Sequence, residues 1–309
     1  MVVGVVDPDP LAQEAARRSG LPAWSTIEEG VRLGGEAAIV ASPPAEHPDQ
    51  TIACLRLGMA VLVEKPFALS LEAAVRVAQE STRLGLPVAV AQNFRFLRRE
   101  RAVRKALAAG VGRPLSATII SARPPTVAMP HVAAIEHGAV WDICIHHLDA
   151  LRVRFGAAPE RVEMKVARLG ASPADERLLF RLLLEWPGGP AVVYQHSEGA
   201  PGFYHSEWIE GEQRAIIVND QNVRVLFPRH RARPVNPPRG RQPEQAVLDD
   251  FLGALCSGSA PTLSAEDNLL TVATVEAAVR AEALGRPVTP AEVGEAAGVA
   301  VGADGAAHG

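Results

Sequence analysis

The chain has 309 residues, a length that indicates about two domains. Hydrophobic residues make up 48% and charged residues 21%, which is ordinary for a globular protein and excludes general disorder. The net charge of −4 provides no basic field, so we expect neither nucleic acid nor a membrane as a partner. Of the 31 basic residues only three are lysines (Lys65, Lys105 and Lys165), so each lysine calls for a specific explanation.

Location follows from cysteine usage and from the absence of targeting patterns. The three cysteines (Cys54, Cys144 and Cys256) form neither a disulfide framework nor a CxxC pair, which is typical of a reducing compartment. The sequence has no signal-peptide pattern and no apolar run long enough to span a membrane. We therefore expect a cytoplasmic protein.

Strands and helices alternate over the first third of the chain. Short apolar runs predict strands, the first of them buried, at residues 2–6, 37–41, 60–63 and 88–90. Segments bounded by capping and stop residues predict helices at residues 11–18, 26–33, 48–57 and 70–84. Strands separated by helices of this length indicate βαβ crossovers and a parallel sheet.

The remainder of the chain has a different pattern. Strand-like segments occur at residues 115–121, 161–169, 177–186, 191–197, 203–209, 215–219 and 221–227. Helices are expected at residues 141–154, 244–257 and 264–284, with a loop rich in proline and arginine at 229–241. The fold class is therefore α/β, followed by an α+β part with a largely antiparallel sheet. We expect domains at 1–96 and 97–290, and a flexible tail at 291–309.

The carboxyl ends of parallel strands are where open α/β sheets bind ligands. Asp7 ends the first predicted strand, where a carboxylate can accept hydrogen bonds from a nucleotide ribose, although an Asp before proline is also a common turn former. The turn Ser42, Pro43 and Pro44, with His47 soon after, can pass beneath a planar ring or be only a turn.

Lys65 gives a stronger signal, within the sequence Glu64-Lys65-Pro66 at the end of the third predicted strand. Burial of a lysine there is costly unless it is paired, and a cis bond before Pro66 would direct the side chain into a crevice. Such a lysine can donate a hydrogen bond to a carbonyl or relay a proton. The alternative is a surface lysine at a strand exit, but the scarcity of lysine favours function.

Three polar residues share one face of the helix predicted at 141–154. Asp142, His146 and Asp149 are spaced i, i+4 and i+7. A histidine near carboxylates suits proton transfer. One alternative is a metal site that adds His131 or His137, and the other is a buried His–Asp brace that only supports the fold.

These motifs together resemble the glucose–fructose oxidoreductase / inositol dehydrogenase (Gfo/Idh/MocA) family. The resemblance covers nearly the whole chain and rests on Asp7, Ser42-Pro43-Pro44 with His47, Glu64-Lys65-Pro66, Gln92-Asn93-Phe94-Arg95-Phe96, Asp142-x-x-x-His146-x-x-Asp149 and the helix start at 263–268. It implies a Rossmann domain, then an α+β domain with a large open sheet. It also implies NAD- or NADP-dependent oxidation or reduction of a sugar or cyclitol hydroxyl or carbonyl group.

The resemblance also implies roles for individual residues. Lys65 would bind the reacting oxygen, His146 would be the general acid/base, and Asp142 would orient both the substrate and His146. Asp149 would give structural support, Arg95 would lie near the cleft, and Asp7 would favour NAD over NADP. The positions expected to contact cofactor are Asp7, Ser42, Pro43, Pro44, His47, Glu64, Lys65, Gln92 and Arg95. No metal is implied.

One departure from the family pattern is large. The family begins with a strand, a Gly-x-Gly-x-x-Gly turn and a helix, and this sequence contains none of them. The missing strand lies at the centre of a Rossmann sheet, so its loss would leave buried strand edges unpaired. One reading is that the true frame starts upstream and the chain is an intact dehydrogenase. A second is a short variant with cofactor-free acid/base chemistry of isomerase or lyase type, and a third is a non-catalytic member.

The remaining signals concern partners. The basic stretches at 95–105 and 229–241 are expected to be solvated faces, since no nucleic-acid motif accompanies them. An open sheet with one exposed face, on which Trp208 would lie, predicts a homodimer or homotetramer. The substrate is expected to be a small polyol or sugar-like molecule.

Overall fold

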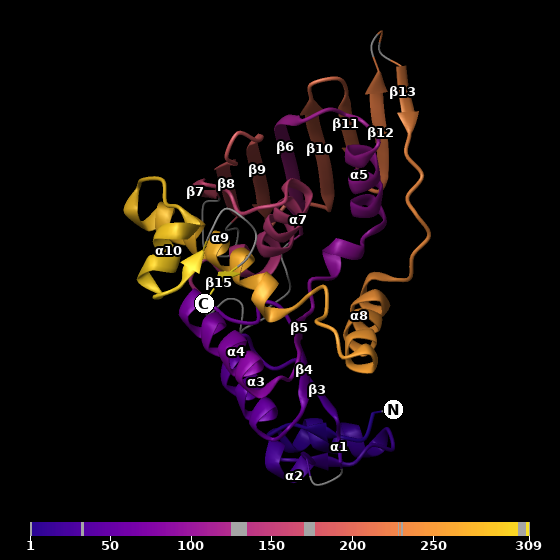
Figure 1. Cartoon of the computed structure of the whole chain (residues 1–309), viewed down its shortest axis with the longest axis vertical. Helices are drawn as coiled ribbons and strands as arrows, with labels where there is room; N and C mark the ends of the chain where they lie inside the picture. Colours follow the sequence, from indigo (N-terminus) through magenta and orange to yellow (C-terminus); the bar gives the residue numbers. More distant parts are fainter. Residues whose placement is uncertain are drawn as a thin grey trace.

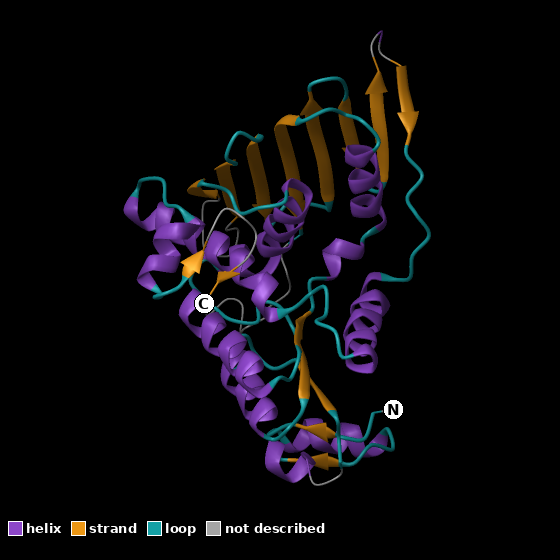
Figure 2. Ribbon diagram, in the orientation of Figure 1, coloured by secondary structure: helices purple, strands orange, loops and turns teal. Residues whose placement is uncertain are grey.

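The computed structural model describes residues 2–31, 34–124, 135–169, 177–227, 229, 231–301 and 307–308. A small α/β part lies at one end of the molecule, and a large sheet lies at the other (Figure 1). Figure 2 shows helices packed between and beside these two sets of strands. The predicted fold class, a Rossmann-like part followed by a large open and mostly antiparallel sheet, is confirmed.

The first part contains five short strands and the helices between them. The strands are β1 (Val5–Val6), β2 (Ala23–Trp24), β3 (Ala37–Val40), β4 (Ala60–Val63) and β5 (Val88–Val90). The helical elements are α1 (Pro10–Arg18), α2 (Ile27–Val31), α3 (His47–Arg56), α4 (Leu71–Leu84) and the 3₁₀ turn η1 (Asn93–Phe96). The expected caps are present, since Ser70 accepts from the amide of Ala73 and Thr26 and Glu29 exchange the two hydrogen bonds of a capping box.

These five strands form two separate parallel sheets. β3, β4 and β5 pair in that order, whereas β1 pairs with β2. Within the described residues β3 therefore has one edge without a strand partner, and its Ile39 is 63% exposed. The prediction of a buried strand over residues 2–6 is wrong, because only Val5 and Val6 form it and Val6 is 39% exposed. A strand with a neighbour on one side only cannot bury both of its faces and edges.

The second part is built on an eight-stranded sheet. Its strands are β6 (Pro114–Arg123), β7 (Arg161–Leu169), β8 (Arg177–Glu185), β9 (Ala191–Glu198), β10 (Tyr204–Gly211), β11 (Ala215–Asn219), β12 (Asn222–Phe227) and β13 (Arg231–Pro234). Their order is β13-β12-β11-β10-β6-β9-β8-β7, and only the β6–β9 pair is parallel. β13 lies within the segment that the sequence predicts as a loop, because its residues are rich in arginine and proline, yet it pairs with the preceding strand β12.

Helices cover one face of this sheet. α5 (Arg98–Ala108) and α7 (Ile145–Phe155) lie in front of the strands in Figure 1, and α9 (Ala265–Leu284) packs against β7. α8 (Pro243–Ser257) packs against η1 and β4. The opposite sheet face leaves Ile120, Val193 and Trp208 between 38% and 40% exposed. None of the helices in the described part of the chain combines the length and apolar character needed to cross a membrane.

The end of the chain differs from the expected flexible tail at 291–309. Residues Pro290–Ala296 form helix α10, which starts with a capping box between Thr289 and Glu292. Val293 is fully buried in the main core. Two further short strands, β14 (Ala300–Val301) and β15 (Ala307–His308), pair with each other. The sequence did not predict this packing, because the segment consists mostly of small and polar residues and its helix has one valine, Val293, in the core.

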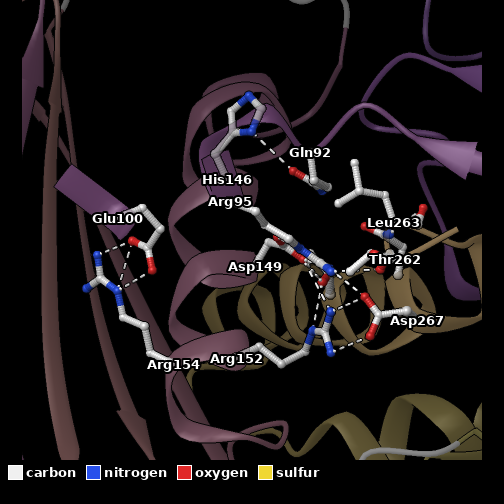
Figure 3. Close-up of polar contacts among 12 residues, drawn as sticks. Gln92, Arg95, Glu100, His146, Asp149, Arg152, Arg154, Thr262, Leu263 and Asp267 are labelled. Atoms are coloured by element: carbon white, nitrogen blue, oxygen red, sulfur yellow. Dashed lines mark hydrogen bonds and ion pairs between the residues drawn. The ribbon is translucent and has the colours of Figure 1, made fainter. Parts of the chain in front are cut away.

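A buried ion cluster joins the two parts of the molecule. Asp149 of α7 is fully buried, and its two oxygens accept from Arg95 of η1 at 2.6 and 2.7 Å. Arg95 and Arg152 also both contact Asp267 of α9, at 2.5 and 2.6 Å, and Thr271 donates to Asp149 at 2.8 Å (Figure 3). Because buried charges are stable only when paired, this cluster fixes η1 against α7 and α9.

We predict that Asp149→Asn lowers the free energy of unfolding by about 3–5 kcal/mol, because it leaves Arg95 and Arg152 buried with Asp267 as their only carboxylate in the cluster. Urea unfolding measures the change. The matched control is Asp49→Asn, which removes an exposed ion pair with Arg76 and should change the free energy by less than about 0.5 kcal/mol. Equal, small effects of the two substitutions would contradict the role of the cluster.

Candidate active site

Lys65 lies at the carboxyl end of β4, where the chain turns through a cis Lys65-Pro66 bond. Its ammonium group donates to the carboxylate of Asp142 at 2.6 Å and to the carbonyl oxygen of Asp142 at 2.7 Å. The side chains of Lys65 and Asp142 are 17% and 14% exposed, so the pair borders solvent without being immersed in it. Glu64 is exposed and, among the described residues, accepts from the Lys65 amide and not from the Lys65 ammonium, so Asp142 is the carboxylate that holds the lysine.

Asp142 stands in a π-helical turn, η2 (Val140–Cys144), that leads directly into α7. Such turns are frequent at functional sites. The prediction of one continuous helix over 141–154 is therefore correct in position, but its first turn is π-helical and not α-helical. The three polar residues of this segment do point the same way, since Asp142 contacts Lys65, His146 contacts Gln92 and Asp149 contacts Arg95.

Arg123 at the end of β6 completes the surroundings of Asp142. Its guanidinium donates to Asp142 at 2.8 Å and to Glu198 of β9 at 2.5 Å. Burial by itself would raise the pKa of Asp142, but the charges and hydrogen bonds of Lys65 and Arg123 hold that pKa below its usual value. The sequence did not single out Arg123, because its significance comes from a helix that is distant along the chain.

His146 is buried one turn further along α7. Its Nδ1 lies 3.1 Å from the side-chain oxygen of Gln92, and its ring stacks on Phe94 with centroids 4.2 Å apart. Burial, and then the positive charge of Lys65, lowers the pKa of His146 to about 3. The imidazole is therefore neutral over the physiological range.

Other predicted site residues make contacts that the sequence could not specify. Arg95, expected near a cleft, is instead buried in the ion cluster with Asp149 and Asp267. Both ring nitrogens of His47 lie at hydrogen-bonding distance from carbonyl oxygens, of Ser42 at 2.7 Å and of Pro66 at 2.8 Å. His47 thus ties the turn after β3 to the turn after β4.

The metal alternative would use Asp142 and His146 with His131 or His137. Among the described residues, no group of three histidine, cysteine or acidic side chains is arranged to hold a metal ion. His137 pairs with Glu282 at 3.3 Å. His131 lies outside the described residues.

The residues present fit one half of a dinucleotide. The turns that carry Ser42, Pro43 and Pro44 and then Glu64 and Lys65 end adjacent strands, where a nicotinamide ring would lie beside Lys65.

The pyrophosphate half is not matched by the described residues. Asp9 caps α1 by accepting from the amide of Leu11 at 2.9 Å, and Asp7 accepts from the amide of Asp9 at 2.8 Å. Asp7 ends the strand at which a ribose contact is expected, and the glycine-rich turn that presents free amide groups to a pyrophosphate does not occur in this sequence. The contact of Asp7 with a ribose stays a prediction.

We predict that His146 makes the protein less stable in acid. The folded pKa of about 3 lies below the unfolded value of about 6.5, so the unfolded chain binds more protons between these values. The stability that depends on neutral His146 is present above about pH 6.5 and is lost as the pH falls towards about 3. Between about pH 7.5 and pH 4, urea unfolding should show the wild type losing roughly 2–3 kcal/mol more than His146→Gln. The same pH dependence in both proteins would refute the lowered pKa.

Comparisons with known proteins agree with this architecture. Residues 1–92 match the Gfo/Idh/MocA model for an oxidoreductase family with an NAD-binding Rossmann fold, and residues 101–221 match the Gfo/Idh/MocA C-terminal domain. The D-apiose dehydrogenase of Paraburkholderia graminis is 27% identical over 275 residues, which cover 81% of this chain and 71% of that protein. The inositol 2-dehydrogenase of Rhizobium meliloti is 24% identical over 302 residues, covering 93% and 91%.

Solved structures share the fold. An oxidoreductase from Agrobacterium radiobacter, in complex with NAD⁺, L-tartaric acid and magnesium, aligns with a TM-score of 0.81 at 23% identity, covering 93% of this chain and 90% of that one. A levoglucosan dehydrogenase in complex with NADH and levoglucosan aligns with a TM-score of 0.78 at 21% identity, with the same coverage. Since the two matched family domains together span more than half of the sequence, the chain belongs to the Gfo/Idh/MocA family of oxidoreductases.

Proposed function

We propose that the protein is an NAD-dependent oxidoreductase that acts on a hydroxyl or carbonyl carbon of a sugar or cyclitol, with Lys65 and His146 handling the proton. The observation that carries this proposal is the meeting of Lys65, Asp142 and His146 at the carboxyl ends of the parallel strands. Family membership and relatives named as D-apiose and inositol dehydrogenases support the same class of reaction.

The proton chemistry follows from the charge states of the three residues. The Lys65 ammonium donates a hydrogen bond to the reacting oxygen and favours its negative charge as a hydroxyl is oxidised. His146, kept neutral by burial, accepts the hydroxyl proton and returns it in the reverse reaction. Asp142 holds Lys65 in place through its carboxylate and its carbonyl oxygen. The nicotinamide, when bound, supplies or accepts the hydride.

The balance of charge supports an uncharged substrate. Lys65 and Arg123 are positive, Asp142 and Glu198 are negative, and the four groups contact one another in a chain. His146 adds no charge. These four paired groups therefore carry no surplus charge, which suits a polyol or sugar better than a carboxylic acid.

A second candidate function is cofactor-independent acid/base chemistry of the isomerase or lyase type, or a non-catalytic role. It is favoured by the absence from this sequence of the Gly-x-Gly-x-x-Gly turn that presents backbone amides to a pyrophosphate. It uses the same Lys65 and His146 pair without a hydride acceptor.

We also propose that the chain assembles as a homodimer or homotetramer through the open sheet face. The exposed side chains of Ile120, Val193 and Trp208 on three adjacent strands support this assembly, since contiguous apolar patches are usually covered.

Binding of NADH separates the two candidate functions. We expect purified protein to bind NADH with a saturable change in nucleotide fluorescence that excess NAD⁺ reverses, because the family domain binds this nucleotide. Failure of NADH to bind would overturn the oxidoreductase proposal and leave the cofactor-free chemistry.

The catalytic assignment is tested with lysine variants. Reduction of NAD⁺ is followed with myo-inositol, D-apiose and levoglucosan, and Lys65→Met should lower kcat for the best substrate by roughly 10²–10⁴-fold. Lys105→Met is the matched control, because Lys105 is exposed on α5 and donates to the carbonyl oxygen of Asn236, with no hydrogen bond or ion pair to Asp142, His146 or Gln92 in the described part of the chain. Wild-type turnover by Lys65→Met would refute the assignment.

A further inference from the structure

Gln92 holds a position that the proton chemistry above does not use. It lies two residues after the end of β5, is 1% exposed, and directs its side chain at the ring of His146 (Figure 3). The side-chain oxygen of Gln92 lies 3.1 Å from Nδ1 of His146. Phe94, two residues on, stacks on the same ring with an interplanar angle of 9°. Gln92 and Phe94 thus hold one edge and one face of the imidazole.

An amide oxygen can only accept a hydrogen bond, so its partner Nδ1 must carry the proton. In a neutral imidazole the proton then cannot also be on Nε2, which keeps a free electron pair. When Nε2 takes up a proton, Nδ1 keeps its own and the contact with Gln92 survives. The opposite orientation of the amide would place an N–H group against Nδ1, which would leave the ring proton on Nε2 and prevent Nε2 from accepting another.

We propose that Gln92 is a positioning residue that fixes His146 in the Nδ1-protonated tautomer, so that Nε2 is the atom that accepts and returns the substrate proton. The inference rests on the proposed role of His146 in the reaction. The stacked ring of Phe94 supports it, because it restricts rotation of the imidazole that would exchange the two nitrogens.

The choice of an amide is informative because two other buried histidines have carboxylate partners. Nε2 of His205 lies 2.7 Å from Glu207, and Nε2 of His196 lies 3.1 Å from Glu198. A carboxylate stabilises the imidazolium form, whereas an uncharged amide directs the tautomer without holding a positive charge.

The charged groups around His146 do not compete with this role. They are Lys65 and Arg123, which disfavour the imidazolium, and Asp142 and Asp149, which favour it. Gln92 therefore acts on the location of the proton and not on the net charge of the site.

The tautomer is measured directly by ¹⁵N NMR of the histidine rings in the full-length protein, with His146→Gln identifying the signals of His146. The wild type should show the Nδ1–H form. Gln92→Leu, which is close in size, should shift the tautomer ratio towards Nε2–H by about tenfold or more, since it removes one buried hydrogen bond. It should also lower kcat by roughly 10-fold to 100-fold.

Gln92→Glu provides a second readout that a merely structural role would not produce. The introduced carboxylate should stabilise the imidazolium, so the acid limb of the pH–kcat profile should move to higher pH. Thermal unfolding of both variants checks that they are folded.

An Nε2–H tautomer in the wild type, or an unchanged ratio in Gln92→Leu, would overturn the inference. If the tautomer behaves as expected but His146→Gln keeps full turnover, Gln92 orients His146 and the proposed function of His146 fails. The two failures are therefore distinguishable.

Discussion

The structure depends on one buried carboxylate, Asp149, and the two arginines that neutralise it. Arg95 comes from the end of the small α/β part, and Arg152 lies on the same helix as Asp149. Asp267 of α9 binds both arginines from a third segment. A charge without solvent must be paired with good geometry, so none of the three segments can shift without exposing an unpaired ion.

This constraint explains how a site is assembled from distant parts of the chain. Lys65 follows a strand of the first part. Asp142 in η2 and His146 in α7 both lie within about two helical turns of Asp149, which fixes this helix. Arg95 follows Gln92 by three residues, so the same ion cluster sets the position of Gln92 against His146. The large sheet adds Arg123, which shares Asp142 with Lys65.

Local patterns in the sequence predicted much of this arrangement. Capping residues marked α2 and α4, the apolar run before Lys65 marked β4, and the i, i+4, i+7 spacing placed three polar residues on one face. What could not be predicted depends on partners far along the chain. Examples are the contact of Arg123 with Asp142 and the burial of Arg95, whose carboxylate partners are Asp149 and Asp267.

The burial of the strands in the first part also could not be predicted from the local sequence. A β-branched run such as 2–6 predicts a strand, but its burial depends on neighbours that the run itself does not specify. Here β1 and β3 belong to different sheets, and Ile39 remains exposed on β3. The site lies instead at the carboxyl ends of β4 and β5, which pair with each other.

The most direct test of this account is the turnover of Asp149→Asn at a temperature at which urea and thermal unfolding show it to be fully folded. Asp149 lies outside the reacting groups, so its effect must pass through the alignment of Lys65, Gln92 and His146. We expect kcat to fall by roughly tenfold or more while the protein remains folded, because small misplacements of catalytic groups are costly. Wild-type kcat in the folded variant would contradict the claim that this ion cluster aligns the site.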